Sequence, residues 1–298
     1  MSIRHKLLSP YLLMVLPPLF WAGNAVVGRA AVGELPPIAL AFWRWLFAFL
    51  LLLPIGLPRI LAQKALVRRQ WKVLCLLALS SVTAYNTFLY IALTTTTAVN
   101  ATLVSAAIPV AIVGLSWAWT GETVSKRQGA GILLSLAGVL LVIARGDLQA
   151  LLSLSLHVGD LWALTAVASW AVFSVLLRRH PTGLDAFALL TVQVGLGLLF
   201  LSPLYLLELA SGARMILTPH SLGLIAYVAI FPSAVAYGFW NRGVAELGAS
   251  VAGQYTNLIP VFTAVLAALL LGESFHWFHS AGLVLIFAGI WLATRGGR

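Results

Sequence analysis

Charge is scarce in this sequence. Only 9% of its 298 residues are charged, whereas 61% are hydrophobic, and the mean hydropathy is +1.00. A soluble globule of this size needs more polar surface, so the composition indicates an integral membrane protein. The net charge of +10 does not indicate nucleic-acid binding, because the basic residues lie in short segments between apolar runs rather than on one polar face.

Acidic residues and cysteine are rarer still. The eight Asp and Glu and the six His all fall at or near the ends of apolar runs. A proton-driven antiporter usually keeps a carboxylate or an imidazole near the middle of a span, so we expect no proton coupling of that kind. Cys75 is the only cysteine, which excludes a disulfide and a cysteine-based metal site within one chain. We expect neither a metal nor a cofactor.

Apolar runs alternate with short polar connectors along the whole chain. Runs of about 16 to 24 residues are long enough to cross the hydrocarbon core as helices. The sequence predicts ten such spans, near residues 7–28, 37–57, 73–93, 98–119, 128–144, 161–177, 186–207, 221–241, 248–271 and 275–294. The first has the basic flank of a signal peptide, but it lacks a small-residue cleavage site and nine spans follow it, so we expect it to be retained.

The distribution of Lys and Arg predicts the orientation. If the N-terminus is cytoplasmic, fourteen of the 18 basic residues fall on the cytoplasmic side, in agreement with the positive-inside rule. We therefore expect a multi-pass protein of a bacterial inner membrane with both termini in the cytoplasm. The fourteen residues are Arg4, Lys6, Arg59, Lys64, Arg68, Arg69, Lys72, Lys126, Arg127, Arg178, Arg179, Arg242, Arg295 and Arg298.

One block of sequence occurs twice. Residues 98–146 and 249–297 share 15 identities in 49 positions at a constant offset of 151. An offset of 149 aligns Trp21 with Trp170 further upstream. Two five-span units are predicted, 1–149 and 150–298, and the odd number of spans inverts the second, as in alternating-access transporters. The repeated positions include Pro109, Gly121, Glu122, Gly131 and Gly138, which recur as Pro260, Gly272, Glu273, Gly282 and Gly289.

These motifs carry a resemblance to a known family. Two five-helix halves, each ending in Pro, then Gly-Glu, then a Gly-rich helix, resemble the EamA-type exporters of the drug/metabolite transporter superfamily. Within it the chain is most similar to the YddG branch of amino-acid exporters. The resemblance covers nearly the whole chain and implies an all-α membrane protein with ten helices around a central cavity. Helices 1, 3, 4, 6, 8 and 9 would line that cavity, with helices 5 and 10 more peripheral.

Polar and aromatic side chains inside the spans are the candidate substrate-binding residues, because in hydrocarbon they need a partner or a water-filled cavity. Each amide could instead serve only to hydrogen-bond a neighbouring helix. The candidates are Trp21, Asn24, Tyr85, Asn86, Tyr90, Asn100, Trp162, Ser169, Trp170, Ser233, Tyr237, Asn241, Gln254 and Asn257. Aromatic residues near span ends are interpreted as interfacial; these are Tyr11, Trp119, Trp240 and Trp277.

Arg44 and two prolines are the other unusual residues within the spans. Arg44 could meet a substrate carboxylate or could tie down carbonyl groups of a neighbouring helix. The structural role is favoured, because the resemblance places the second helix outside the cavity wall. The second unit has Gln193 at the equivalent position. Pro109 and Pro260 each free a carbonyl within a span, which predicts either a hinge or a fixed kink.

The side-chain chemistry limits the cargo. A cavity lined by amides, hydroxyls and aromatic rings, without a fixed acid, suits a neutral or zwitterionic solute with an apolar side chain. Aromatic and large apolar amino acids fit it best, exported by alternating access, and lipophilic drugs or other metabolites are the main alternative. An enzyme would need a cluster of His, Cys and acids that the sequence does not place at usable spacing. A purely structural bundle would not require inverted repeats.

Overall fold

The computed structural model describes residues 9–96, 101, 104–121, 123–144, 147, 149, 158–271 and 276–294. All of the secondary structure in these residues is helical. Two shorter apolar helices, Ile108–Trp119 and Trp277–Ala293, accompany six segments that are long and apolar enough to cross a membrane. The six are Pro10–Ala30, Pro37–Ala62, Trp71–Thr95, Val158–Arg179, Ala186–Ala210 and Pro219–Leu247. The candidate Asn100 and the Glu of both Gly-Glu motifs lie outside the described residues.

Each predicted span overlaps a described helix, and ten membrane crossings remain a prediction. The first half contains α1 (Pro10–Leu13), α2 (Leu16–Ala30), α3 (Pro37–Ala62), α4 (Lys64–Arg69), α5 (Trp71–Ala78), η2 (Leu79–Ala84), α6 (Tyr85–Thr95), α8 (Ile108–Thr120) and α9 (Lys126–Ile143). The second contains α11 (Val158–Arg179), α12 (Ala186–Ala210), α13 (Pro219–Val228), η3 (Ala229–Val235), α14 (Ala236–Leu247), α15 (Ala249–Gln254), η4 (Tyr255–Leu258), α16 (Ile259–Leu271) and α17 (Trp277–Thr294).

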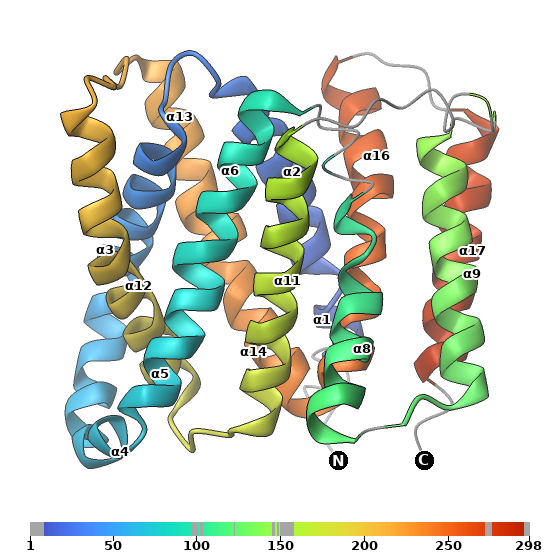
Figure 1. Cartoon of the computed structure of the whole chain (residues 1–298), viewed down its shortest axis with the longest axis horizontal. Coiled ribbons are helices and arrows are strands. Elements are labelled where there is room, and N and C mark those ends of the chain that lie inside the picture. The colour runs from blue at the N-terminus through green and yellow to red at the C-terminus, as the bar shows by residue number, and fades with distance from the viewer. Residues whose placement is uncertain are drawn as a thin grey trace.

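The helices stand side by side, with their ends gathered at two levels (Figure 1). Helices α9 and α17 form one edge of the molecule, and α3 and α12 lie at the opposite edge. Helices α2, α6, α11 and α14 lie between them. The basic helix α4, the start of α9 and the ends of α11 and α14 share the lower level in Figure 1. The described basic connectors are therefore on one side, as the predicted topology requires.

Glycine allows α9 and α17 to approach closely. A Cβ atom added to Gly131 would lie 2.6 Å from the carbonyl oxygen of Gly289, and one added to Gly138 would lie 2.8 Å from that of Gly282. Small residues at such contacts are typical of helix pairs in lipid. The contact is reciprocal, because Gly131 corresponds to Gly282 and Gly138 to Gly289 at the offset of 151. Reciprocal contacts of this kind are expected about a twofold axis.

Two π-helical segments interrupt the helical segments that run through the middle of the molecule. Segment η2 joins α5 to α6, and η3 joins α13 to α14. Segment η2 begins at Leu79, which the offset of 151 aligns with Ile230. Segment η3 begins one residue earlier, at Ala229. A π turn widens the helix and takes carbonyl groups out of the regular ladder, and such turns are frequent at functional sites. These segments direct attention to the centre.

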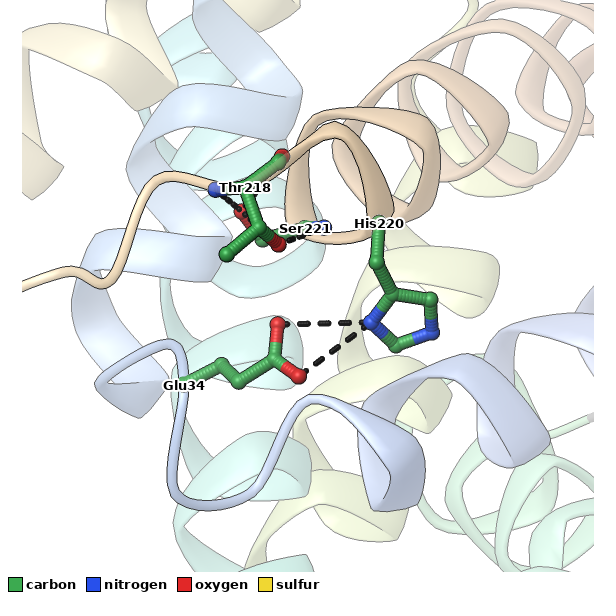
Figure 2. Close-up of polar contacts among 4 residues, drawn as sticks. All are labelled: Glu34, Thr218, His220 and Ser221. Atoms are coloured by element: carbon green, nitrogen blue, oxygen red, sulfur yellow. Dashed lines mark hydrogen bonds and ion pairs between the residues drawn. The ribbon is translucent and has the colours of Figure 1, made fainter.

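The connectors at the other level are tied together by polar contacts (Figure 2). Thr218 and Ser221 form a capping box at the start of α13, with each side chain accepting a hydrogen bond from the other residue's backbone N–H at 3.0 and 2.8 Å. Glu34, which follows α2, lies 3.2 Å from Nδ1 of His220. The backbone carbonyl oxygen of Glu34 also accepts a hydrogen bond from the N–H of Ile216 at 2.8 Å. The connector after α2 is thereby fixed to the start of α13.

Candidate substrate site

Four buried aromatic residues meet at the centre of the described structure: Trp21 of α2, Trp170 of α11, and Tyr237 and Trp240 of α14. The rings of Trp21 and Trp170 meet edge to face with centroids 5.1 Å apart. Trp240 lies 5.3 Å from Trp21, and Tyr237 lies 5.3 Å from Trp170. We term this group the central aromatic cluster. It joins residues of both predicted units.

The prediction that Trp240 is an interfacial residue is wrong. Its side chain is fully buried in the cluster, because α14 continues to Leu247 and places Trp240 well inside the helix. The helical period carried the missed signal, since Trp240 lies three residues after Tyr237 and seven after Ser233 on one face. The other aromatic residues interpreted as interfacial are exposed: Tyr11, Trp119 and Trp277.

Carbonyl groups of the π segments accept hydrogen bonds from the central side chains. Nε1 of Trp21 donates to the carbonyl oxygen of Pro232 at 3.1 Å, and the hydroxyl of Tyr237 donates to that of Ser81 at 2.9 Å. Ser81 and Pro232 are counterparts at the offset of 151. The π segment of each predicted unit thus offers a carbonyl group to an aromatic residue of the other unit. Carbonyls that leave the helical ladder are satisfied without water.

Asn86 joins the same network. Its Nδ2 atom donates to the carbonyl oxygen of Ser81 at 2.9 Å and to the hydroxyl of Tyr237 at 3.2 Å. Tyr85, the preceding residue, contacts Trp170 with ring centroids 4.7 Å apart. The structure therefore brings these two candidates of the third predicted span to the central aromatic cluster.

A second polar group surrounds Arg44, whose residue is only 1% exposed. Its Nε donates to Oγ of Ser233 at 2.8 Å, and its Nη1 donates to Oδ1 of Asn24 at 3.1 Å and to the hydroxyl of Tyr90 at 2.5 Å. The guanidinium lies 5.0 Å from the ring centroid of Trp45. Helix α3 lies at an edge of the molecule, but Arg44 points inward to residues of α2, α6 and η3. We term Arg44, Asn24, Tyr90 and Ser233 the Arg44 group.

The counterpart of Arg44 has similar contacts and no charge. Gln193 is fully buried and donates through Nε2 to Oγ of Ser81 at 2.6 Å. Nδ2 of Asn241 donates to Oε1 of Gln193 at 3.3 Å. Asn241 is the counterpart of Tyr90 at the offset of 151. The two predicted units thus have related contacts at this place, with a cation and a phenol in the first and two amides in the second.

Acidic residues are at helix ends throughout the part of the chain that the structure describes. None of them forms a hydrogen bond or an ion pair with Arg44. Glu208 accepts from the first N–H groups of α3, Asp185 caps α12, Asp160 accepts from Thr96 at the start of α11, and Glu246 pairs with Arg242. The carboxylates thus have structural partners away from the central aromatic cluster.

The remaining candidates have more local contacts. Ser169 donates to the carbonyl oxygen of Ser80 in η2 at 2.8 Å. Gln254 is buried and donates to its own helix. Nδ2 of Asn257 donates to Oγ of Ser135 in α9 at 2.9 Å, which is the interhelical role considered as the alternative for the amides.

Trp162 lies apart from the cluster. It is 37% exposed and stacks on Phe88, with ring centroids 5.5 Å apart. The two prolines lie where the helix geometry changes. Pro109 and Pro260 are the second residues of α8 and α16, directly after an irregular turn and the 3₁₀ segment η4. Pro260 lies inside the continuous helical run of α15, η4 and α16, and the choice between a hinge and a fixed kink stays a prediction.

One small cavity lies beside the central aromatic cluster. A cavity of about 30 Å³ lies beside Trp21, Asn24 and Tyr85. That volume suits a water molecule, whereas pockets for small organic ligands are about 300–1,000 Å³. Among the described residues, the rings of the central aromatic cluster pack against one another beside this cavity.

Several buried polar atoms near the cluster have no hydrogen-bond partner among the described residues. They are Nε1 of Trp45, Nε1 of Trp170, Nε1 of Trp240 and Oδ1 of Asn241. Buried polar atoms without a partner are uncommon in folded proteins, and each calls for a physical explanation. An indole N–H group can donate a hydrogen bond to a polar ligand, and an amide oxygen can accept one.

Comparison with known proteins agrees with this geometry. Residues 8–144 and 157–295 match the EamA-like transporter family. An uncharacterized transporter of Archaeoglobus fulgidus is 32% identical over 289 residues, which cover 95% of this chain and 96% of that protein. The uncharacterized transporter YyaM of Bacillus subtilis is 27% identical, with 97% and 94% covered.

Two further similarities are more distant. A probable amino-acid metabolite efflux pump of Salmonella typhimurium is 28% identical over 184 residues, which cover 59% of this chain and 60% of that protein. A solved structure has a TM-score of 0.77 at 21% sequence identity, with 97% of this chain and 98% of that chain covered. The similarity to the solved structure shows a shared fold.

Proposed function

The chain belongs to the EamA-like transporter family and is a multi-pass membrane transporter, not an enzyme, and from this premise we propose its cargo and mechanism. It exports small neutral or zwitterionic metabolites, first among them amino acids with aromatic or large apolar side chains, across a bacterial inner membrane. The central aromatic cluster beside the Arg44 group is the observation that carries this proposal.

The chemistry of that centre supports an amino acid. Aromatic rings such as Trp21 and Trp170 offer faces and edges on which an aromatic or aliphatic side chain can pack. Hydroxyls and amides such as those of Tyr90 and Asn24 can pair with an ammonium or a carboxylate. The described acids are elsewhere, so an organic cation would find no carboxylate at this place. The printed name of the Salmonella relative is in keeping with this cargo.

Alternating access between two inverted five-helix units, 1–149 and 150–298, is the proposed mechanism. The family matches each half of the chain, which supports the two units. The reciprocal glycine contacts of α9 and α17, and the contact of Trp21 with its counterpart Trp170, support a twofold relationship between them. In this proposal α9 and α17 stay packed while the central helices move.

Opening must separate the central aromatic cluster. The moving parts would be the helices that begin at Pro109 and Pro260 and the helices that contain η2 and η3, because irregular turns change their angles at low cost. Each hydrogen bond lost contributes only about 0.5–1.5 kcal/mol, and a bound solute can replace it. Transport then runs down the gradient of the solute without a midplane proton site.

Purified protein in liposomes tests this function. The measurement is counterflow of labelled phenylalanine with competitors from three classes: other amino acids, hydrophobic cationic dyes and nucleosides. We expect competition by large apolar amino acids and little by dyes or nucleosides. Competition by cationic dyes alone would contradict the proposal and favour export of lipophilic drugs.

A further inference from the structure

Arg44 is a buried cation with only neutral hydrogen-bond partners. Its Nε and Nη1 atoms donate to Ser233, Asn24 and Tyr90, and its Nη2 atom donates to no residue that the structure describes. A guanidinium inside a membrane protein is costly unless it has a counterion or serves a solute pathway. The partners here are dipoles and the rings of Trp45 and Tyr90.

The equivalent position in the second unit indicates that tying the helices together does not require a positive charge. Gln193 is buried as deeply and joins Ser81 to Asn241 with amide groups alone. A neutral side chain therefore suffices for this type of contact between helices. The charge of Arg44 calls for another explanation, which a bound anion would supply.

The place of Arg44 is suited to such an anion. Asn24 lines the small central cavity together with Trp21 and Tyr85, and its Oδ1 atom accepts from Arg44 Nη1 at 3.1 Å. The guanidinium is thus one side chain behind the cavity wall. Oδ1 of Asn24 also accepts from the Tyr90 hydroxyl at 2.8 Å, so it can leave Arg44 and retain a donor.

We propose that Arg44 binds the carboxylate of the transported solute. This inference rests on the proposed function and specifies its site. When the centre opens, two carboxylate oxygens replace neutral acceptors on the planar guanidinium, in the paired geometry that arginine favours. The apolar side chain of the solute then lies toward Trp170 and Trp240. Because Gln193 carries no charge, the solute binds in one orientation relative to the two units.

Transport of L-phenylalanine and L-phenylalaninamide tests the proposal, because the amide lacks the carboxylate. We expect Arg44→Gln in liposomes to lower kcat/KM for phenylalanine by about 10-fold to 100-fold, the range of a hydrogen bond to a charged group. Its kcat/KM for phenylalaninamide should change little. Gln193→Leu is the matched control, and we expect it to affect both compounds equally. Equal losses for both compounds in Arg44→Gln would overturn the proposal.

A second variant and a binding measurement keep the test decisive. Arg44→Lys retains the charge without the planar fork, so we expect a several-fold higher KM for phenylalanine alone. Thermal unfolding of detergent-purified protein with 3-phenylpropionate reports carboxylate binding without transport. We expect 3-phenylpropionate to raise the melting temperature of the wild-type protein. At the same concentration it should not raise that of Arg44→Gln or Arg44→Lys. If the wild-type protein is not stabilised, the assignment of Arg44 is wrong, whereas failure to transport phenylalanine contradicts the proposed function.

Discussion

The side-chain amide of Asn86 donates a hydrogen bond of 3.2 Å to the hydroxyl of Tyr237, which lies 151 residues later in the chain. That separation equals the offset of 151 found for residues 98–146 and 249–297. Trp21 and Trp170, counterparts at an offset of 149, also touch. Counterparts that touch lie close to the axis that relates two copies of a fold. In the predicted two-unit arrangement, both contacts lie near the axis that relates the units.

Energetic coupling between Asn86 and Tyr237 follows from this contact. We expect Asn86→Ala and Tyr237→Phe together to cost about 0.5–2 kcal/mol less than the sum of the single changes, because the second change removes a bond already lost. The measurement is the free energy of unfolding in mixed micelles for the four proteins of the cycle. The control pair is Thr94→Ala with Tyr237→Phe, since Thr94 bonds only to its own helix. Additivity of the first pair would contradict the contact.

The packing of α9 against α17 predicts a severe effect of one methyl group. A Cβ at Gly289 would lie 2.5 Å from the carbonyl oxygen of Gly131 and 2.7 Å from the backbone nitrogen of Ser135. Backbone cannot yield as a side-chain tip can, so we expect Gly289→Ala to destabilise by about 1–3 kcal/mol or more. Gly223→Ala is the control, since nothing lies within 4 Å of its added Cβ. Thermal unfolding monitored by size-exclusion chromatography compares them, and equal melting temperatures would refute the close contact.

The sequence predicted the framework well where residue chemistry acts over short range. The repeat in the sequence includes Gly131, Gly138, Gly282 and Gly289, and α9 and α17 meet at those glycines. Position inside the predicted spans made Trp21, Asn24, Asn86 and Tyr237 candidates, and all four are buried.

The rest depended on tertiary structure. No residue type marks a π segment, so η2 and η3, with the carbonyls that they free, were not predicted. Trp240 was misplaced because the length of α14 determines its depth. The second span was expected outside the cavity wall, but a long side chain such as Arg44 reaches the centre from a helix at the edge. The packing of the central aromatic cluster depends on contacts between rings of several helices. The periodicity of one helix gives no information on those contacts.

Substrate preference should depend on Trp21 and not on Trp162. Trp21→Phe removes the indole that donates to Pro232 and shortens a ring in the central aromatic cluster. We expect kcat/KM to fall several-fold for tryptophan and to fall less for leucine, because a smaller ring packs less well on an aromatic solute. Trp162→Phe, at an exposed position, should leave the ratio unchanged. Liposome transport of both amino acids measures it, and the site would lose support if the two variants behaved alike.

A pH gradient should have little effect on the rate of transport. The described acids and histidines are at helix ends or in connectors, so the centre offers no group that could exchange a proton with the solute. We expect phenylalanine flux in liposomes to change by less than about twofold when one pH unit is imposed across the membrane, which corresponds to about 1.4 kcal/mol per proton moved. Collapse of the gradient with a protonophore is the control. A tenfold response would show proton coupling.

Two contacts near the connector after α2 and the start of α13 should contribute differently to stability. They are the helix cap of Thr218 and the contact of His220 with Glu34. The Thr218 hydroxyl accepts a hydrogen bond from the N–H of Ser221 at the start of α13 (Figure 2). Without that hydroxyl, the N–H of Ser221 would have no partner. We expect Thr218→Ala to lower the free energy of unfolding by about 1 kcal/mol. His220 pairs with Glu34 across the connectors, but its side chain is 59% exposed and screened by water. His220→Gln should therefore cost less than about 0.5 kcal/mol. Unfolding in mixed micelles compares the two variants, and a larger loss for His220→Gln would mean that the ion pair, and not the helix cap, holds these connectors together.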